Sequence, residues 1–474
     1  MLNEFEFREW LDRNKSYSHR VIKDIVCRFN RVEKMLPLDD NHEKYMWELE
    51  KILNSDKFSP NVKSQLRKSV KLYFEFLENQ VSNNRVPKNK IKVGSMFSNI
   101  GVAEANLEKI GFSVVVANEL EERRAKLYSS IYPNSKMVVG DITKEYVFNE
   151  FVNISKELNI DVLMATPPCQ GMSTAGQQKD DDGRNLLILP VVSAIKKLQP
   201  KYVFIENVPM FLKTKIEVRG KKYLITDYLN QNLSKQYAIN IFLVDVSDFA
   251  VPQTRDRAII LLTRRDLNKE WVMPKKSPQK VTLFDTIGHL PELDPFVKDI
   301  SELERNRLFP DYSQKRQKAL KISRWHTPPH HIYRQVEAMM HTETGRTAFD
   351  NEIYYPKKAD GTAVKGYRNT YKRQHWNRPA YTVTMDNRKI SSQNNVHPGR
   401  KYLGKNGEIL YSDARTLTLY EIMLIMTLPK SWNLPENAPE AFVRRIIGEG
   451  IPPLFVEKVF SQLLTLERGN YGKD

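Results

Sequence analysis

The sequence predicts an α/β fold with a Rossmann-like, doubly wound sheet, preceded by a helical extension and carrying a separate insert. Three observations support this prediction. From Ile91 onward, short apolar runs alternate with helical stretches, which is typical of βαβ units and a parallel sheet. Polar residues follow several of these runs directly, as they do where strands end at a ligand crevice. The first 80 or so residues show only helical periodicity.

Composition limits the function classes. The 474 residues suffice for two or three domains, and the formal net charge of +17 favours a polyanionic partner, with nucleic acid first and an anionic membrane surface second. No apolar run reaches the roughly 18–20 residues that span a bilayer, and the first residues do not resemble a signal peptide. Two cysteines cannot form a disulfide framework, so a cytoplasmic, reduced protein is expected.

Residues 1–88 are predicted to form the helical extension. Apolar residues recur on one helical face, and Ser59-Pro60 is a plausible helix start. Cys27 lies in an apolar stretch and is predicted to be buried. The polar segment from Val81 to Lys88 is predicted to be a linker.

The first strand of the sheet is predicted from Ile91 to Phe97. The turn Ser98-Asn99-Ile100-Gly101 follows it, and a helix is expected from Val102 to Ile110, capped by Gly111. Later apolar runs predict further strands at residues 114–117, 137–141, 161–165, 202–205 and 258–262.

Polar side chains stand where these runs end. Glu119, Asp141, Cys169 and Glu206 each follow a predicted strand. The carboxyl ends of parallel strands meet along one edge of a sheet, so the four residues are expected to line one crevice. A single acid at such a place is often only a turn residue, but four together favour a pocket.

Residues 264–377 lack the βαβ rhythm and are rich in proline, histidine, aromatic and basic residues, which favours nucleic-acid docking. The histidines at 326, 330 and 331 raise the question of a metal site, but no cysteine lies nearby and no metal is expected. Residues 378–474 are predicted to contain a strand at 378–384 and helices at 417–428 and 454–466. They are also predicted to return to the sheet domain of residues 89–263. The predicted domains are therefore 1–88, 89–263, 264–377 and 378–474.

The crevice suits a nucleoside cofactor without a pyrophosphate. A dinucleotide site would need three glycines in the first turn, and this turn has only Gly101. Glu119 is placed to accept from ribose hydroxyls, and Asp141 from an adenine amino group. S-adenosylmethionine is the natural candidate for such a site.

Cys169 and Glu206 add a reaction. A thiolate can attack an electron-poor ring carbon, and a carboxyl group can donate a proton to a ring nitrogen. Arg255 or Arg257 could hold a carbonyl oxygen and orient the carboxyl group.

Taken together, these residues resemble the DNA (cytosine-5) methyltransferase family. The resemblance covers about residues 91–466. It rests on motifs in the family's order: Phe97 to Val102, Asn118-Glu119, Gly140-Asp141-Ile142, Pro167-Pro168-Cys169-Gln170, Asp182 to Leu187, Glu206-Asn207-Val208, Gln253 with Arg255 and Arg257, Arg378-Pro379 to Thr384, and Gly448 to Pro452.

The resemblance implies a mechanism and a set of partners. A target cytosine in duplex DNA is flipped out, Cys169 adds to its carbon 6, and Glu206 acts on ring nitrogen 3. The insert corresponds to a target recognition domain. A monomer is expected, protecting DNA from a cognate restriction endonuclease. The residues expected to bind S-adenosylmethionine are Phe97, which would stack on the adenine, Ser98, Asn99, Ile100, Gly101, Val102, Glu119, Leu120, Asp141, Ile142, Pro168 and Leu187.

The chain departs from the family pattern at three positions. Glycine usually stands at the place of Asn99, an acid at Ser95 and asparagine at Glu449. Asparagine tolerates positive φ better than most residues, so the turn can be kept. Two alternatives remain open: a cytosine-5 methyltransferase acting on RNA, and an inactive DNA-binding regulator.

Overall fold

The computed structural model describes residues 4–15, 17–38, 42–54, 58–85, 90–168 and 183–468. Its contacts divide the chain into two compact units, Met1–Lys88 and Asn89–Asp474. None of the helices in these ranges is long and apolar enough to cross a membrane.

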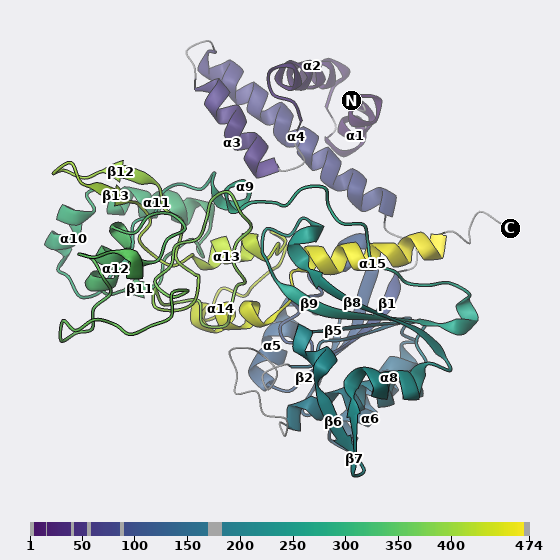
Figure 1. Cartoon of the computed structure of the whole chain (residues 1–474). Helices are drawn as coiled ribbons and strands as arrows, with labels where there is room; N and C mark the ends of the chain where they lie inside the picture. Colours follow the sequence, from purple (N-terminus) through teal and green to yellow (C-terminus); the bar gives the residue numbers. More distant parts are fainter. Residues whose placement is uncertain are drawn as a thin grey trace. The chain divides into compact units, whose positions relative to one another are not determined.

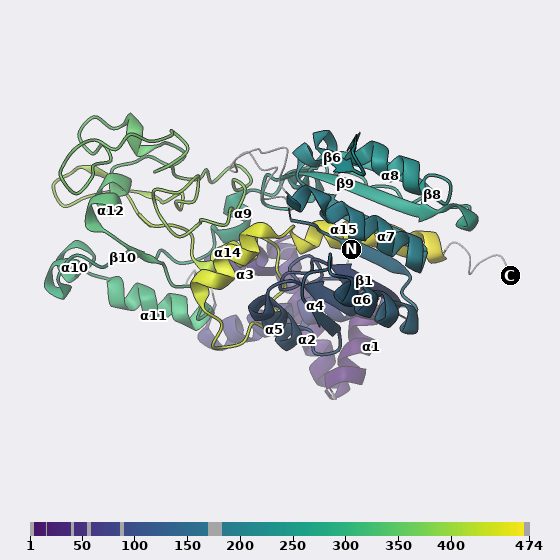
Figure 2. The same cartoon turned by 90° about the horizontal axis from the view of Figure 1, so that it is seen from below.

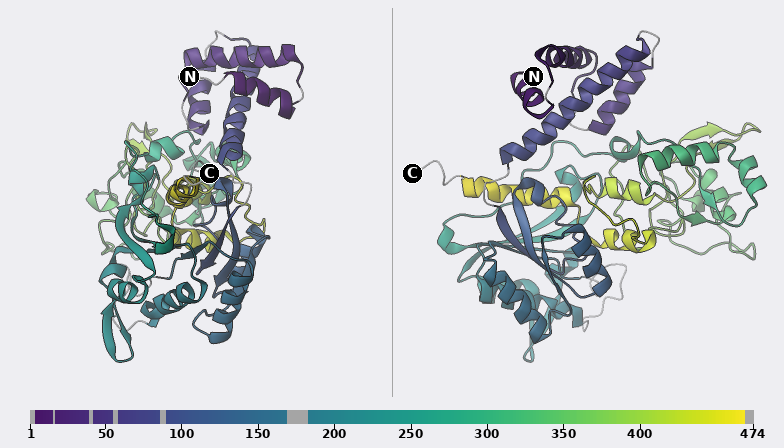
Figure 3. Two further views of the ribbon diagram at one scale, coloured as in Figure 1. Left: turned by 90° about the vertical axis from the view of Figure 1, so that its right-hand side faces the viewer. Right: turned by 180° about the vertical axis from the view of Figure 1, so that it is seen from behind.

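The first unit is built from four helices, drawn in purple in Figure 3. Phe7, Phe29 and Tyr73 pack ring against ring in its core. Cys27 is exposed, so the prediction that it is buried was wrong: Ile22, Ile25, Val26, Phe29 and Val32 form the buried face, and Cys27 lies off it. The last helix runs through the first five residues of the predicted linker. The helices are α1 (Glu4–Lys15), α2 (His19–Met35), α3 (His42–Leu53) and α4 (Pro60–Arg85).

The second unit contains a seven-stranded sheet in the order β3-β2-β1-β4-β5-β9-β8. Neighbours from β3 to β5 are parallel, and β9 runs antiparallel to both β5 and β8. This confirms the predicted doubly wound α/β sheet. The strands are β1 (Ile91–Met96), β2 (Phe112–Glu119), β3 (Lys136–Val139), β4 (Val162–Ala165), β5 (Tyr202–Asn207), β8 (Tyr237–Asp245) and β9 (Asp256–Arg264).

Alternate residues of the central strands enter two separate cores. In β4, Leu163 and Ala165 join one hydrophobic cluster, whereas Val162 and Met164 join the other. Helices α6 (Glu145–Glu157), α7 (Ile188–Leu198) and α8 (Ile225–Leu233) cover the first face. The C-terminal helix α15 (Pro453–Arg468) covers the second face, so the chain returns to the sheet as predicted (Figure 1).

The helix predicted from Val102 to Ile110 is wrong. The structure has successive turns there, and only Glu108–Ile110 forms a short 3-10 helix, η1. The backbone bonds join residues three apart, as from Leu107 N to Glu104 O at 2.9 Å, so no α-helical ladder develops. Gly111 ends the segment in the left-handed conformation, with φ 97°, which the predicted cap requires.

Between β9 and α15 the second unit consists of short elements. Figure 2 shows α10, α11 and α12 grouped apart from the strands of the sheet. One hydrophobic cluster in this region extends from Val297 to Ala414. The predicted strand at 378–384 is wrong: Ala380 forms only an isolated bridge with Gln253. The elements are α9 (Leu283–Ile287), β10 (Phe296–Val297), α10 (Glu302–Leu308), α11 (Tyr312–Ile322), β11 (His330–His331), α12 (Tyr333–Met340), β12 (Lys401–Leu403), β13 (Ile409–Tyr411), α13 (Leu419–Ile425) and α14 (Glu440–Glu449).

The remaining elements of this unit are one helix, one hairpin and five further 3-10 segments. They are α5 (Glu122–Ile131), β6 (Lys215–Val218), β7 (Lys221–Leu224), η2 (Gly183–Leu187), η3 (Pro209–Lys213), η4 (Val246–Phe249), η5 (Arg265–Leu267) and η6 (Ala348–Asp350).

A fully buried ion cluster joins the short elements to α13. Arg415 donates to Asp413 at 2.8 Å and to both carboxylate oxygens of Glu421 at 2.8 and 2.9 Å, and its Nε donates to Leu293 O at 2.9 Å. None of the three charged side chains is more than 1% exposed. Removal of the cation therefore leaves two buried carboxylates without their partner.

Arg415→Met is expected to lower the free energy of unfolding by about 3–5 kcal/mol, because the two buried carboxylates lose the cation that bonds both of them. Lys126→Met is the control, since Lys126 pairs with Glu122 on the surface at 2.7 Å with both side chains more than 70% exposed. Urea unfolding of both variants measures the difference. Equal losses in the two would contradict the assignment.

Candidate active site

The carboxyl ends of the parallel strands lie in register at one edge of the sheet. Met96, the last residue of β1, is level with Ala165, and Ala165 is level with Ile205 of β5. The strand order reverses between β1 and β4. An open α/β sheet forms its ligand crevice at such a reversal.

The turn after β1 forms one wall of this crevice. Phe97, Asn99 and Gly101 have φ values of 60°, 55° and 79°. A Cβ at Gly101 would lie 2.1 Å from Cε2 of Tyr132, so a side chain has no room there. Ser98 N donates to Asn118 O at 2.9 Å and fixes the turn to the end of β2. Phe97 is partly buried against the sheet core.

Glu119 ends β2 and holds the turn from the other side. Its Oε2 accepts from Asn99 N, and its Oε1 from Glu121 N, both at 2.9 Å. Burial raises the pKa of Glu119, although the Glu121 N–H, the charge of Arg124 and the Asn99 N–H oppose this rise. The next residue, Leu120, is 64% exposed. The crevice thus combines a carboxylate with an apolar surface.

Asp141 and Ile142 follow β3. Asp141 Oδ1 accepts from Thr143 N at 2.9 Å and from Thr143 Oγ1 at 2.8 Å, and the carboxylate remains partly exposed. Ile142 is buried in the core below, as are Ile100 and Val102 of the first turn in a neighbouring cluster. These three residues therefore anchor the turn and the end of β3 in the core.

The residues of this crevice fit a nucleoside that carries hydrogen-bond donors. Asn99 Oδ1 is buried and has no partner within the described part of the chain. It offers an acceptor beside those of Glu119 and Asp141. The turn holds a single glycine, and the carboxylates would repel a phosphate. This donor and acceptor chemistry fits S-adenosylmethionine.

Glu104 lies buried beneath the turn, and the sequence did not identify it as a candidate. Ser95, which stands where the family usually has an acid, donates from Oγ to Glu104 Oε1 at 2.6 Å. Burial raises the pKa of Glu104 to about 7. The hydrogen bond from Ser95 opposes this rise, and the charge of Glu119 adds to it. An acid is thus present near this position after all, supplied by another residue.

Glu104 is expected to make stability pH-dependent. The Glu104 carboxyl group binds a proton more tightly in the folded protein than in the unfolded chain. Its contribution to folding stability is therefore complete below the unfolded pKa of about 4.5 and is lost as pH rises through about 7. The shift corresponds to about 3 kcal/mol. Glu104→Gln should remove this dependence, which urea unfolding of both proteins at pH 5.5 and 8.0 would measure. Identical pH dependence in the two would contradict the prediction.

Glu206 and Arg257 meet at the end of β5. Glu206 and Ile259 are cross-strand partners, and Arg257, two residues before Ile259, lies diagonally on the same face. Arg257 Nε lies 2.6 Å from Glu206 Oε1, and the two side chains are only 11% and 12% exposed. Arg257 Nη1 also donates to Asp256 O at 2.7 Å. Arg257 therefore holds the Glu206 carboxyl group through one of its two oxygens.

Cys169 lies outside the described residues, as do Gln170 and Asp182, but hydrogen bonds fix the residues that precede it. Asn207 Nδ2 donates to Pro167 O at 3.0 Å. Thr166 Oγ1 donates to Phe97 O at 3.1 Å. The structure thus gives Asn207, which the sequence did not single out as a site residue, a positioning contact beside the catalytic loop. Pro168, the last described residue before Cys169, is exposed, and Leu187, at the end of η2, is half-buried.

Arg255 is buried and contacts other elements. Its guanidinium donates to Val383 O and to Gly448 O, both at 2.8 Å, and to Gln253 Oε1 at 3.3 Å. Gln253 Oε1 also accepts from Val383 N at 3.0 Å. These bonds join the start of β9 to the 378–384 segment and to the end of α14. The structure therefore gives Arg255 a positioning contact and places Arg257 on Glu206.

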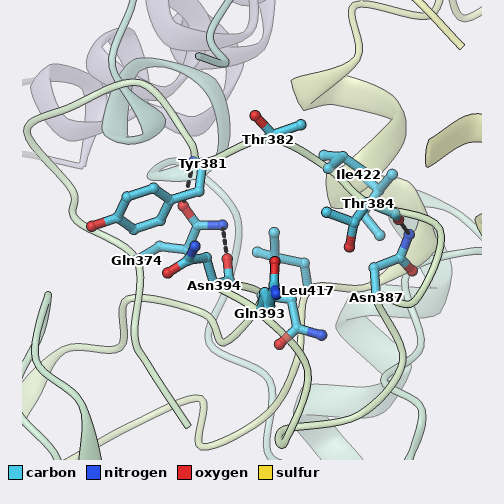
Figure 4. A pocket seen from close by; sticks show the side chains of 11 residues that line it. Gln374, Tyr381, Thr382, Thr384, Asn387, Gln393, Asn394, Leu417 and Ile422 are labelled. Carbon is cyan, nitrogen blue, oxygen red and sulfur yellow. Dashed lines mark hydrogen bonds between the residues drawn. The ribbon is translucent and has the colours of Figure 1, made fainter. Parts of the chain in front are cut away.

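A small pocket lined by amide, hydroxyl and aliphatic side chains lies beside this junction (Figure 4). Gln374 Oε1 accepts from Tyr381 N at 2.9 Å, and its Nε2 donates to Asn394 O at 2.7 Å. Asn387 Nδ2 donates to Thr384 O at 2.7 Å. Thr382 is exposed, and its hydroxyl donates to Thr254 O at 2.6 Å. The 381–394 segment is thus held rigidly next to Arg255.

The histidines at 326, 330 and 331, which raised the question of a metal site, each have a different partner. His326 Nδ1 bonds Thr418 Oγ1 at 2.9 Å, His331 Nε2 accepts from Thr416 N at 3.3 Å, and exposed His330 stacks on Phe296. No cluster of three metal-binding side chains occurs among the residues that the structure describes.

Comparisons with known proteins agree with this architecture. The sequence pattern of the C-5 cytosine-specific DNA methylase family matches residues 91–465. The Type II methyltransferase M1.HgaI of Avibacterium volantium is 41% identical over 78% of this chain and 97% of its own length. The Type II methyltransferase M1.HphI of Haemophilus parahaemolyticus is 25% identical over 78% and 86%, respectively.

One solved structure supports the fold. The crystal structure of a candidate DNA modification methyltransferase encoded within an E. coli prophage superposes with a TM-score of 0.54 at 18% identity, covering 80% of this chain and 100% of the other. At this identity the likeness concerns the fold alone.

Proposed function

Because the chain belongs to the C-5 cytosine-specific DNA methylases, we propose that it methylates carbon 5 of cytosine at one short sequence in duplex DNA, with S-adenosylmethionine as the methyl donor. The ion pair of Glu206 with Arg257 at the strand-end crevice, beside the fixed approach to Cys169, carries this proposal.

The first turn and the ends of β2 and β3 would hold the methyl donor. Phe97 would stack on the adenine ring, Glu119 would accept from the ribose hydroxyls, and Asp141 from the adenine amino group. Ser98, Ile100, Gly101, Val102, Leu120 and Ile142 would complete the wall, with Pro168 and Leu187 at the ends of the catalytic loop. Asn99 Oδ1 supports this assignment, because it is a buried acceptor with no partner among the described residues, and such acceptors are rare.

Cys169 and Glu206 would act on opposite parts of a flipped cytosine. The Cys169 thiolate bonds to carbon 6 while Glu206 donates a hydrogen bond or a proton to nitrogen 3, and the ring electrons move to carbon 5. Carbon 5 then takes the methyl group that S-adenosylmethionine supplies. Carbon 5 gives its proton to solvent, nitrogen 3 returns its proton to Glu206, and Cys169 leaves as the thiolate. Arg257 keeps the Glu206 carboxyl group in place during these steps.

DNA would lie across the crevice and the region formed by residues 264–377. The hydrophobic cluster of this region continues to Ala414, which supports extending the recognition region beyond residue 377. Exposed Arg388, Lys389 and Gln393 carry the donors that suit phosphates and base edges. The net charge of +17 agrees with a polyanionic substrate.

The biological role follows from the relatives. M1.HgaI and M1.HphI are Type II methyltransferases, so we infer that this enzyme protects cytoplasmic DNA from a restriction endonuclease of the same specificity. We infer that it works as a monomer, since the second unit of a single chain contains every described residue of the crevice.

Incubation with labelled S-adenosylmethionine and random duplex DNA, followed by bisulfite sequencing, tests the proposal. Label should enter DNA as 5-methylcytosine at a single sequence, and transfer RNA should not compete. Absence of label, or label in transfer RNA in preference to DNA, would contradict it.

A further inference from the structure

Two residues that depart from the family pattern contact each other in the structure. Asn99, where glycine is usual, donates from Nδ2 to Oε2 of Glu449, where asparagine is usual, at 3.3 Å. The two residues are 350 positions apart in the chain. Their contact joins the first turn of the crevice to the end of α14.

Arg124 of α5 holds Glu449 in this position. Its Nη1 lies 2.6 Å from Glu449 Oε2, and the two side chains are 13% and 16% exposed. Arg123 stacks on Phe442 with 3.9 Å to the ring centroid, which makes a second contact between α5 and α14. Since an acid at a helix C-terminus opposes the helix dipole, α14 itself does not favour Glu449. Its contacts with Arg124 and Asn99 supply another reason for its presence.

The same part of the chain packs tightly against the turn. A Cβ at Gly450 would lie 2.8 Å from Val102 Cγ1, and a Cβ at Gly448 would lie 2.2 Å from Thr384 O. The backbone around Glu449 is therefore fixed from both sides, and its carboxylate has little freedom to move away from Asn99.

The acceptor Glu449 determines how the Asn99 carboxamide points. A carboxylate requires the Nδ2 donor on its side, so Oδ1 must face elsewhere. Oδ1 is buried and has no partner in the portion of the chain that is described. It lies in the turn whose backbone N–H is bonded to Glu119. An unpaired buried acceptor at this place points to a ligand that donates.

We propose that Arg124 and Glu449 hold the Asn99 carboxamide so that Oδ1 accepts a hydrogen bond from an N–H or O–H group of the methyl donor. Asn99 is then a binding residue, and Glu449 and Arg124 are positioning residues. This inference rests on the proposed function, because it requires S-adenosylmethionine to bind in the crevice.

Calorimetric titration of the full-length protein with S-adenosylmethionine tests the proposal. Asn99→Gly removes the carboxamide without strain, since glycine adopts a φ of 55° readily. The Kd should rise about tenfold, as expected for the loss of one hydrogen bond. Glu449→Met, which frees the Asn99 carboxamide to rotate, should raise the Kd similarly. Glu449→Gln, which keeps an acceptor oxygen, should retain most of the wild-type affinity.

The double variant and a matched control separate this role from a structural one. Asn99→Gly with Glu449→Met should bind as Asn99→Gly alone, because orientation has no effect once Oδ1 is gone. Glu121→Met removes the other ion pair of Arg124, at 3.1 Å, without touching Asn99, and should leave the Kd unchanged. Additive losses, or an Asn99→Gly Kd within about twofold of the wild type, would overturn the inference. Wild-type protein that binds no S-adenosylmethionine would instead contradict the proposed function.

Discussion

Replacing Cys169 by serine is expected to lower the rate of methyl transfer to DNA by roughly 10⁴-fold or more, because a neutral hydroxyl group cannot replace a thiolate as the nucleophile. Binding of S-adenosylmethionine should persist, since the crevice residues of β1, β2 and β3 are unchanged. Transfer of labelled methyl groups under single-turnover conditions measures the loss.

The chain provides a matched control for this substitution. Cys27 is the only other cysteine, and it is exposed on the first unit. Cys27→Ser should leave the rate unchanged. A Cys169→Ser protein with wild-type activity would exclude the covalent mechanism, and loss of activity in both variants would point to damage unrelated to the nucleophile.

Glu206→Gln is expected to lower kcat by roughly 10²- to 10⁴-fold, the usual contribution of a positioned acid. An amide cannot protonate nitrogen 3, although it still fits beside Arg257. Arg257→Met should act through the same group, so the double variant should lose little beyond Glu206→Gln alone. Single-turnover rates of the three proteins test this coupling.

Asp161→Asn is the control for Glu206→Gln. Asp161 immediately precedes β4, at the amino end of the strand and opposite to the crevice, and pairs with Lys201 at 2.9 Å. It carries a comparable ion pair but lies far from the strand ends of the crevice, so its substitution should leave kcat within about twofold. Equal losses at Asp161 and Glu206, or strictly additive losses at Glu206 and Arg257, would contradict the assigned roles.

Local sequence patterns predicted the centre of the sheet. The apolar runs at β4 and β5 are short, buried on both faces and followed by polar residues, so strand and site could be identified together. The edge strand β8 was missed although Tyr237–Asp245 is rich in β-branched and aromatic residues. Cys27 was misplaced because apolar neighbours in sequence do not share a helical face.

Contacts between distant parts of the chain could not be predicted. Arg124 gave no signal, because its partner Glu449 is 325 residues away. Arg255 and Arg257 looked equivalent in the sequence, but Arg255 lies before β9, which begins at Asp256. Arg257 lies within the strand and reaches Glu206, whereas Arg255 bonds Val383 and Gly448.

The most direct test of the crevice as the catalytic centre uses duplex DNA that contains 5-fluorocytosine. Fluorine cannot leave carbon 5 as a cation, so the covalent complex should accumulate once the methyl group has been transferred. We expect a complex that resists denaturing electrophoresis, requires S-adenosylmethionine, and yields a DNA-modified peptide containing Cys169. A complex attached at Cys27, or no covalent complex with DNA that the enzyme methylates, would contradict the account.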